Sequence, residues 1–187
     1  KVEMGEEDLA DVVRQAVSSF PALAPRIRVD LPDRTVRVQC DRVRAVQCLS
    51  NLIGNAEKYT PADSPLEVRV ALTAMHAHIH VRDHGAGIPP EKQDKVFERF
   101  YRIEDPMTMK TGGAGLGLHI ARELAVAMGG GLTLETPQVG TGAEFVLHLL
   151  TADAPPFGAV NHTMRPAAAP DTPSPSAVSP APARATM

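Results

Sequence analysis

The spacing of hydrophobic and polar residues divides the first 150 residues into helical and extended segments. Apolar residues at helical spacing predict an amphipathic helix over residues 6–19. A second helix is expected to begin after Asp41, which can cap it, and to end near Tyr59. A third helical pattern starts around Leu118 and stops at the glycines 129–131.

Alternation of apolar and polar residues predicts the strands. Residues 36–40 alternate as a half-buried strand does, and so do residues 66–72 and 75–81. The short joint between the last two segments, at residues 73–74, indicates an antiparallel hairpin. Two further strands are expected on either side of residues 140–142. Hairpins set between helices predict an α+β fold: a two-layer α/β sandwich with a mixed, mostly antiparallel sheet and helices on one face.

Composition separates a folded body from a tail. The 187 residues are 43% hydrophobic, enough for one compact domain over residues 1–150. Residues 151–187 are rich in proline, alanine, serine and threonine and predict a disordered tail, with a proline-rich partner motif as the alternative. The start at Lys1, within polar sequence, is typical of a fragment cut from a longer chain.

Charge and residue usage exclude several classes of function. A net charge of −3, an aromatic content of 4% and the lack of tryptophan argue against a nucleic-acid partner. The sequence contains no apolar run of about 18 residues, the length that a membrane span needs. Cys40 and Cys48 lack metal-ligand spacing, so we interpret them as core residues of a protein from a reducing compartment.

One face of the second predicted helix carries unusual chemistry. Asn51, Asn55, Lys58 and Tyr59 fall at positions i, i+4, i+7 and i+8 and therefore share that face. The Asn55 carbonyl oxygen suits a hard cation such as Mg²⁺, Lys58 offers a point charge for phosphate, and Tyr59 offers a flat ring for a base. The alternative is an ordinary polar helix face in water.

A first glycine-rich loop follows directly on the strand 75–81. It reads Asp83-x-Gly85-x-Gly87. A carboxylate at a strand end can accept a hydrogen bond from an exocyclic amine, and the glycines let the backbone close around a ring. A simple turn is the alternative.

A second loop, Gly113-x-Gly115-x-Gly117, opens the third predicted helix. Free backbone N–H groups and the helix dipole at such a position favour a polyphosphate, with a flexible connection as the alternative. The glycine spacing differs from that of dinucleotide-binding loops, and Lys110 precedes the glycines instead of following them as in a Walker loop.

Taken together, five segments over residues 6–150 resemble, in order, the sequence boxes of sensor histidine kinases. They are the N box from Asn51 to Pro61, the G1 box Asp83–Ile88, the F box Phe97–Tyr101, the G2 box Gly113–Leu118 and the final glycine motif Gly140–Phe145. The resemblance implies the Bergerat nucleotide-binding fold, which gyrase ATPases share, with ATP and Mg²⁺ as ligands.

The resemblance also implies a role for each matching residue. Asn55 would ligate Mg²⁺ with Asn51 in support, Lys58 would contact phosphate, Tyr59 would lie against the adenine, and Asp83 would accept a hydrogen bond from the adenine amino group. Further residues are implied in the base pocket (Gly85, Gly87, Ile88 and Thr141) and around the phosphates (Gly113, Gly115, Leu116, Gly117 and Leu118).

Other segments would act around the nucleotide. The loop 102–113 would be an ATP lid, Phe97 and Phe100 would anchor it, and Arg99 would stabilise the charge of the transferred phosphate. Ala114 stands where the G2 box often has Thr or Ser, which removes a hydroxyl but leaves the backbone donors.

The implied reaction moves the γ-phosphoryl group of Mg-ATP to a histidine on a dimerisation domain of the same protein, which then serves a response regulator. None of the seven histidines lies in a helical context with a following acid and proline, so this chain should bind ATP without phosphorylating itself efficiently. We expect a monomeric, cytoplasmic domain of a protein anchored in the bacterial inner membrane.

Alternatives of other classes remain open. An anti-sigma-factor serine kinase and a non-catalytic nucleotide-sensing module would share some of these motifs. An ATPase subunit of a repair or chaperone machine would need a general-base glutamate one turn before Asn55, where Asn51 stands; Glu57 lies after it.

The histidines add two more open points. His76, His78 and His80 point one way on their strand and could hold zinc, but we interpret them as a solvated face. His84, inside the G1 loop, is a candidate for contact with the nucleotide.

Overall fold

A seven-stranded sheet carries three α-helices on one face in the computed structural model, which describes residues 1–103, 114–135 and 142–153. The α-helices are α1 (Leu9–Ser18), α2 (Arg42–Tyr59) and α3 (Gly117–Ala127). The strands are β1 (Gly5–Asp8), β2 (Ile27–Asp30), β3 (Arg37–Cys40), β4 (Leu66–Leu72), β5 (His76–Arg82), β6 (Gly131–Glu135) and β7 (Glu144–Thr151). Three single 3₁₀ turns cover Pro21–Leu23, Pro90–Lys92 and Lys95–Phe97.

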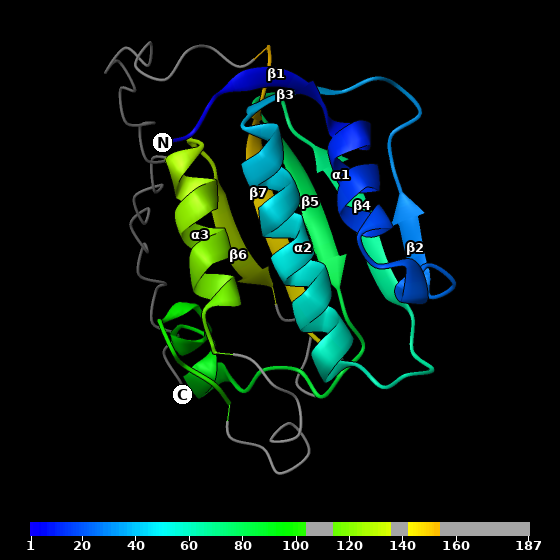
Figure 1. The fold of residues 1–187 in the computed structure, drawn as a ribbon, viewed down its shortest axis with the longest axis vertical. Coiled ribbons are helices and arrows are strands. Elements are labelled where there is room, and N and C mark those ends of the chain that lie inside the picture. The colour runs from blue at the N-terminus through cyan, green and yellow to red at the C-terminus, as the bar shows by residue number, and fades with distance from the viewer. Residues whose placement is uncertain (104–113, 136–141, 154–187) are drawn as a thin grey trace, which may run out of the picture. The chain divides into compact units, whose positions relative to one another are not determined.

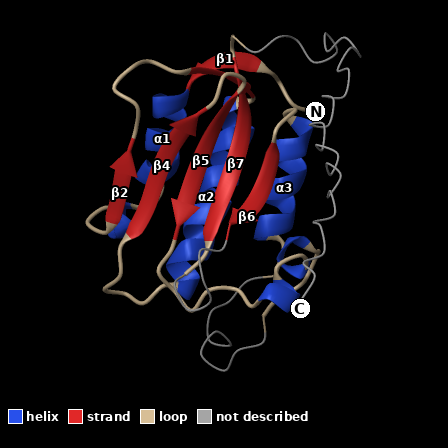
Figure 2. Ribbon diagram, turned by 180° about the vertical axis from the view of Figure 1, so that it is seen from behind, coloured by secondary structure: helices blue, strands red, loops and turns tan. Residues whose placement is uncertain are grey.

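The strand order confirms the predicted mixed, mostly antiparallel sheet. The strands follow the order β1-β3-β7-β5-β4-β2, and β6 pairs with β7 on the same side as β3. Only the β2–β4 pair among these is parallel. The helices lie in front of the sheet in Figure 1, and Figure 2 shows the opposite sheet face from behind. The described helices therefore leave that second face open.

The helix α2 forms as its sequence predicts. The Asp41 side chain accepts hydrogen bonds from the backbone N–H of Arg44 (3.1 Å) and of Glu3 (2.9 Å), which fixes the start of the helix. The helix ends at Tyr59, ahead of Pro61. Its apolar stripe packs against the sheet and consists of Ala45, Cys48, Leu49, Leu52, Ile53 and Ala56.

Two short strands were not foreseen. The predicted helix over residues 6–19 begins only at Leu9, because Asp8 caps it by accepting from the Ala10 N–H (2.9 Å), and the preceding residues form β1. The strand β2 was missed altogether. Both gain their structure from backbone pairing with β3 and β4, which their own sequences do not reveal.

The core confirms that the two cysteines are core residues and corrects the interpretation of one histidine. Cys40 and Cys48 are buried free thiols, and burial raises the pKa of each to about 12. The residues Ala77 and Ile79 are buried on the helix side of β5, as predicted. On the other side His80 is only 7% exposed, so the expectation of a solvated histidine face is wrong for this residue.

Two further predictions concern membrane spans and the C-terminal tail. Among the described residues, no helix has both the length and the apolar character that crossing a membrane requires. Of the predicted tail over residues 151–187, Thr151 is the last residue of β7, and the part from residue 154 onward lies outside the described residues.

Candidate functional site

A cavity of about 310 Å³ lies between the C-terminal half of α2, the loop after β5 and the start of α3. Its volume falls in the range of small-molecule sites. Its walls combine apolar and polar side chains. The lining residues are Ser50, Asn51, Gly54, Asn55, Lys58, Tyr59, Asp83, Ala86, Gly87, Ile88, Val96, Tyr101, Arg102, Ile103, Ala114, Gly115, Leu116, Gly117, Leu118 and Ala143.

The polar face of α2 forms one wall of this cavity. Asn51, Asn55, Lys58 and Tyr59 all line it, as their helical spacing predicts. The two asparagines and Tyr59 are half-buried, whereas Lys58 is exposed. These side chains therefore line a cavity instead of an open polar surface.

Asp83 lines the cavity, one residue beyond β5, and is 4% exposed. Its Oδ1 accepts hydrogen bonds from the backbone N–H of Gly85 (2.8 Å) and of Ala143 (3.2 Å). Burial raises the pKa of the Asp83 carboxyl, although these hydrogen bonds and the charges of His84 and Arg82 oppose the shift. Among the residues that the structure describes, the hydrogen bonds to this carboxylate go to Oδ1.

Gly85 is behind the cavity wall rather than in it. A Cβ at this position would overlap the carbonyl oxygen of Tyr59. Only glycine therefore lets the loop after β5 approach the end of α2 this closely. Gly85 was predicted to line the base pocket. In the structure it sets how closely the loop after β5 approaches the end of α2.

The start of α3 forms the wall facing α2. Its N-cap residue, Leu116, makes no side-chain capping bond, and Leu116, Gly117 and Leu118 line the cavity. Gly115 adopts a left-handed φ of 69° and accepts a hydrogen bond from the Phe100 N–H (3.0 Å). A Cβ on Gly117 would lie 3.7 Å from Asn51 Oδ1, so the amide side chain on α2 and the N-terminus of α3 face each other closely.

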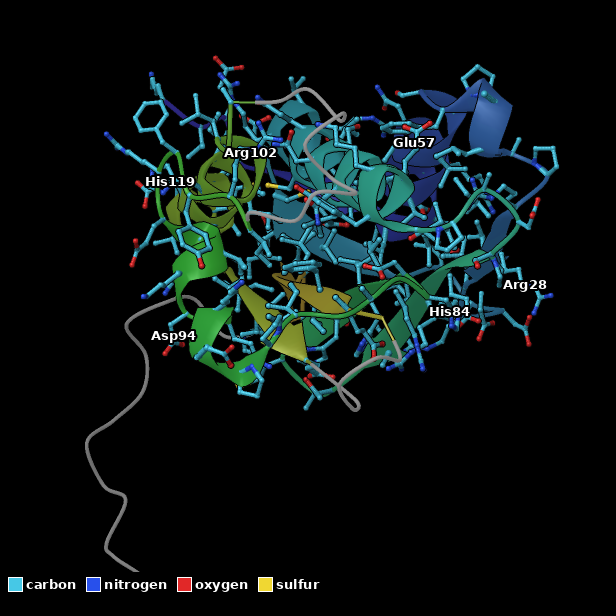
Figure 3. All side chains as sticks on the ribbon, turned by 90° about the horizontal axis from the view of Figure 1, so that it is seen from below. Arg28, Glu57, His84, Asp94, Arg102 and His119 are labelled. Atoms are coloured by element: carbon cyan, nitrogen blue, oxygen red, sulfur yellow. The ribbon has the colours of Figure 1, made fainter. Side chains whose placement is uncertain are left out.

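Two predicted participants lie away from this cavity. The exposed Arg99 donates from Nε to His119 Nε2 (2.7 Å), and His119 Nδ1 lies 3.1 Å from the Phe97 carbonyl oxygen. His84 Nε2 lies 3.2 Å from Glu67 Oε1. Figure 3 shows His84 on the side of the molecule where Arg28 lies, apart from Arg102 and His119. The roles of Arg99 and His84 toward a ligand stay predictions.

Other predicted residues lie outside the described part of the chain. These are Gly113, Thr141 and residues 104–113 of the predicted lid. Arg102 and Ile103, the described residues of the predicted lid, line the cavity, and so do Tyr101 and Ala143, for which no role was predicted. Tyr101 ends the F box, which could have signalled it. Ala143 enters only because its backbone pairs with Asp83, 60 residues away.

The fold and the cavity together define the class of ATP-binding α/β sandwiches that histidine kinases share with other ATPases. Residues 40–153 match the family described as histidine kinase-, DNA gyrase B- and HSP90-like ATPase. The chain belongs to this family.

Individual relatives agree with this assignment. The chain is 39% identical over 121 residues to the sensor histidine kinase WalK of Bacillus subtilis (strain 168), covering 63% of this chain and 20% of WalK. It is 36% identical over 145 residues to the sensor histidine kinase RppB of Synechocystis sp. (strain ATCC 27184 / PCC 6803 / Kazusa), covering 75% of this chain and 32% of RppB. The chain thus spans a third or less of these two relatives.

Solved structures show the same architecture. The nucleotide-free catalytic domain of histidine kinase ThkA superposes with a TM-score of 0.69 and 25% identity, covering 82% of this chain and all of that domain. Full-length ShkA in complex with AMPPNP gives a TM-score of 0.66 and 28% identity over 81% of this chain and 32% of ShkA. These matches thus include a nucleotide-free catalytic domain and a full-length protein in complex with AMPPNP.

Proposed function

We propose that the cavity binds Mg-ATP and that this chain is the ATP-loading domain of a sensor histidine kinase. The observation that carries the proposal is the meeting of three features in one cavity: the polar face of α2, the buried Asp83, and the uncapped start of α3. Asp83 Oδ2 would accept from the adenine amino group. Ile88 and Tyr59 would pack on the ring, and Thr141, in the undescribed segment, is assigned to the same pocket.

The phosphates are assigned to the glycine loop and the start of α3. The first N–H groups of a helix attract anions, and here the N-cap residue Leu116 offers them no side-chain bond. Gly115 and Gly117, together with Gly113 of the undescribed segment, would let the backbone approach the phosphates. Lys58, at the rim, would add a positive charge.

The donor set also fits a Mg²⁺ ion. Asn55 and Asn51 present neutral amide oxygens on the wall that faces the start of α3, and Mg²⁺ takes oxygen ligands while sharing the phosphates of its nucleotide. When bound, the ion would neutralise charge on the phosphates. Asn55 is the assigned ligand and Asn51 supports it.

The relatives support a proposal for the acceptor and the partners. We infer that the γ-phosphoryl group goes to a histidine on a dimerisation domain of the same protein and then to a response regulator, with Arg99 close to the transferred group. The relatives reported above are named sensor histidine kinases, which favours this acceptor over the serine of an anti-sigma-factor system. Within this proposal residues 1–150 are the catalytic domain of a protein anchored in the inner membrane, and residues 151–187 are a tail.

The test is phosphotransfer in trans. The chain is mixed with Mg-[γ-³²P]ATP and the separately produced dimerisation domain of its full-length protein. Label on the acceptor histidine is expected for the wild type and for Gln47→Ala, which alters an exposed α2 residue away from the cavity. Asn55→Ala should abolish the Mg-dependent label while leaving circular dichroism unchanged. Undiminished labelling by Asn55→Ala would remove Asn55 from its assigned role, and labelling by neither protein would contradict the proposed function.

A further inference from the structure

The sheet face opposite the helices carries a row of ionisable side chains. Register places His80 of β5 beside Arg69 of β4, and Glu135 of β6 directly opposite Glu144 of β7. Because side chains alternate along a strand, these residues share the face that Figure 2 shows from behind. Asp83 is an odd number of residues from His80, on the helix side of the sheet, so the cluster is separate from the nucleotide cavity.

Three of these groups converge at one point. Ligand atoms of His80, Glu135 and Glu144 all lie within 4.8 Å of one another, and this is the one such group of three or more metal-binding residue types among the described residues. His80 Nδ1 lies 2.9 Å from Glu144 Oε1, and their side chains are only 9% and 7% exposed. An imidazole nitrogen and two carboxylates are ligand types that zinc accepts in proteins.

A cation already lies at this point of convergence. The Arg69 guanidinium places one nitrogen 2.8 Å from Glu144 Oε1 and 3.0 Å from His80 Nδ1. The Arg69 nitrogen carries two N–H bonds and can donate to both atoms, but when it donates to Nδ1 the imidazole cannot also donate from Nδ1 to Glu144, so two lone pairs face each other at 2.9 Å. A divalent ion would satisfy both lone pairs at once. The Arg69 side chain is 45% exposed, so displacement by an ion would move its guanidinium into solvent without crossing the core.

We propose that His80, Glu144 and Glu135 form a site for a divalent transition-metal ion of the zinc type, in which the ion replaces the Arg69 guanidinium. The site differs from the three-histidine site considered from the sequence. In the structure His78 pairs with His148 instead, and their Nδ1 atoms lie 2.8 Å apart. This site is independent of the proposed nucleotide function, because its ligands lie on the other face of the sheet.

The competition with Arg69 gives the site a testable signature. Removing a metal ligand should weaken binding, whereas removing the competing cation should strengthen it. Zn²⁺ is titrated into the full chain by calorimetry, and Co²⁺ absorption serves as a probe of coordination. Glu135 is exposed, so Glu135→Gln should leave the fold intact. This variant should lower Zn²⁺ affinity about tenfold or more. Arg69→Ala should raise it several-fold.

Three histidine variants test which histidine binds the metal ion. His80→Ala should abolish the Co²⁺ spectrum, and His76→Ala, on the same strand face but outside the cluster, should leave it unchanged. His148→Ala tests the neighbouring histidine pair. The proposal is overturned if Zn²⁺ affinity is insensitive to both Glu135→Gln and Arg69→Ala, or if His148→Ala abolishes binding while His80→Ala does not. Because Glu135 and Arg69 are exposed, these results do not depend on whether a variant at buried His80 folds.

Discussion

The substitution Asp83→Asn separates nucleotide recognition from stability. The Asn Oδ1 can still accept the backbone N–H groups of Gly85 and Ala143, so the loop should keep its shape. The amide nitrogen then takes the place of Oδ2, the oxygen assigned to the adenine amino group. It would face the adenine amino group donor to donor, whereas guanine offers a carbonyl oxygen at that position.

The expected size follows from the bond that is lost. A hydrogen bond to a charged group contributes about 1.5–3 kcal/mol, which corresponds to a loss of roughly 10- to 150-fold in ATP affinity. The selectivity for ATP over GTP should fall by at least as much. Asp63→Asn, the same chemical change on an exposed turn, should leave both affinities unchanged.

Asp83→Asn should weaken ATP binding without lowering the free energy of unfolding at pH 7. Burial raises the pKa of Asp83 above its ordinary value, so the folded state holds this proton more tightly than the unfolded state does. The stability of the wild type therefore falls as the pH rises from the ordinary aspartate pKa through the raised one, and a neutral asparagine escapes this loss. At pH 7 the Asn variant should be at least as stable as the wild type.

Calorimetric titration with Mg-ATP and Mg-GTP, together with urea unfolding at pH 7 and at pH 3, checks both parts. Equal ATP affinity in the wild type and in Asp83→Asn, with both proteins folded, would refute the assignment of Asp83 to the base. A variant that is less stable than the wild type at pH 7 would refute the account of its buried charge.

Two further substitutions and one thiol-labelling experiment test other parts of the structure. Asp41→Ala should lower the free energy of unfolding in urea by about 1–2 kcal/mol at pH 7. Because backbone hydrogen bonds lower the pKa of Asp41, this loss should shrink as the pH falls below the ordinary aspartate pKa. The control Asp41→Asn should retain most of the stability. Cys40 and Cys48, with pKa values raised to about 12 by burial, should resist a thiol reagent at pH 8 until urea unfolds the chain, and rapid labelling of the native protein would contradict their placement. Gly85→Ala should destabilise by about 1–3 kcal/mol and weaken ATP binding because its Cβ overlaps the last carbonyl of α2, whereas Gly5→Ala, whose Cβ would meet nothing closer than 3.8 Å, should change melting temperature and affinity little.

The parts of the fold that the sequence predicts are those with local signals. The bounds of α2 follow from the Asp41 cap and from apolar periodicity, and its polar face could be recognised because two asparagines in a helix interior call for a reason. The hairpin of β4 and β5 follows from alternation on either side of a short joint. Each of these signals lies within about 18 residues of chain.

The parts that the sequence misses depend on distant partners. Three of the four residues of β2 are exposed, so burial leaves little pattern there, and its structure comes from the parallel pairing with β4. The burial of His80 depends on Arg69 and on Glu144, 64 residues away, and no local pattern distinguishes it from a solvated histidine.

The most direct test of the central claim is a titration of the isotopically labelled chain with Mg-AMPPNP, followed by amide NMR spectra. We predict saturable shifts at the residues that line the cavity, above all Asn55, Gly87 and Gly117, and little change on the open face of the sheet around His78. An absence of saturable shifts, or shifts confined to the open face, would contradict the assignment of this cavity to ATP.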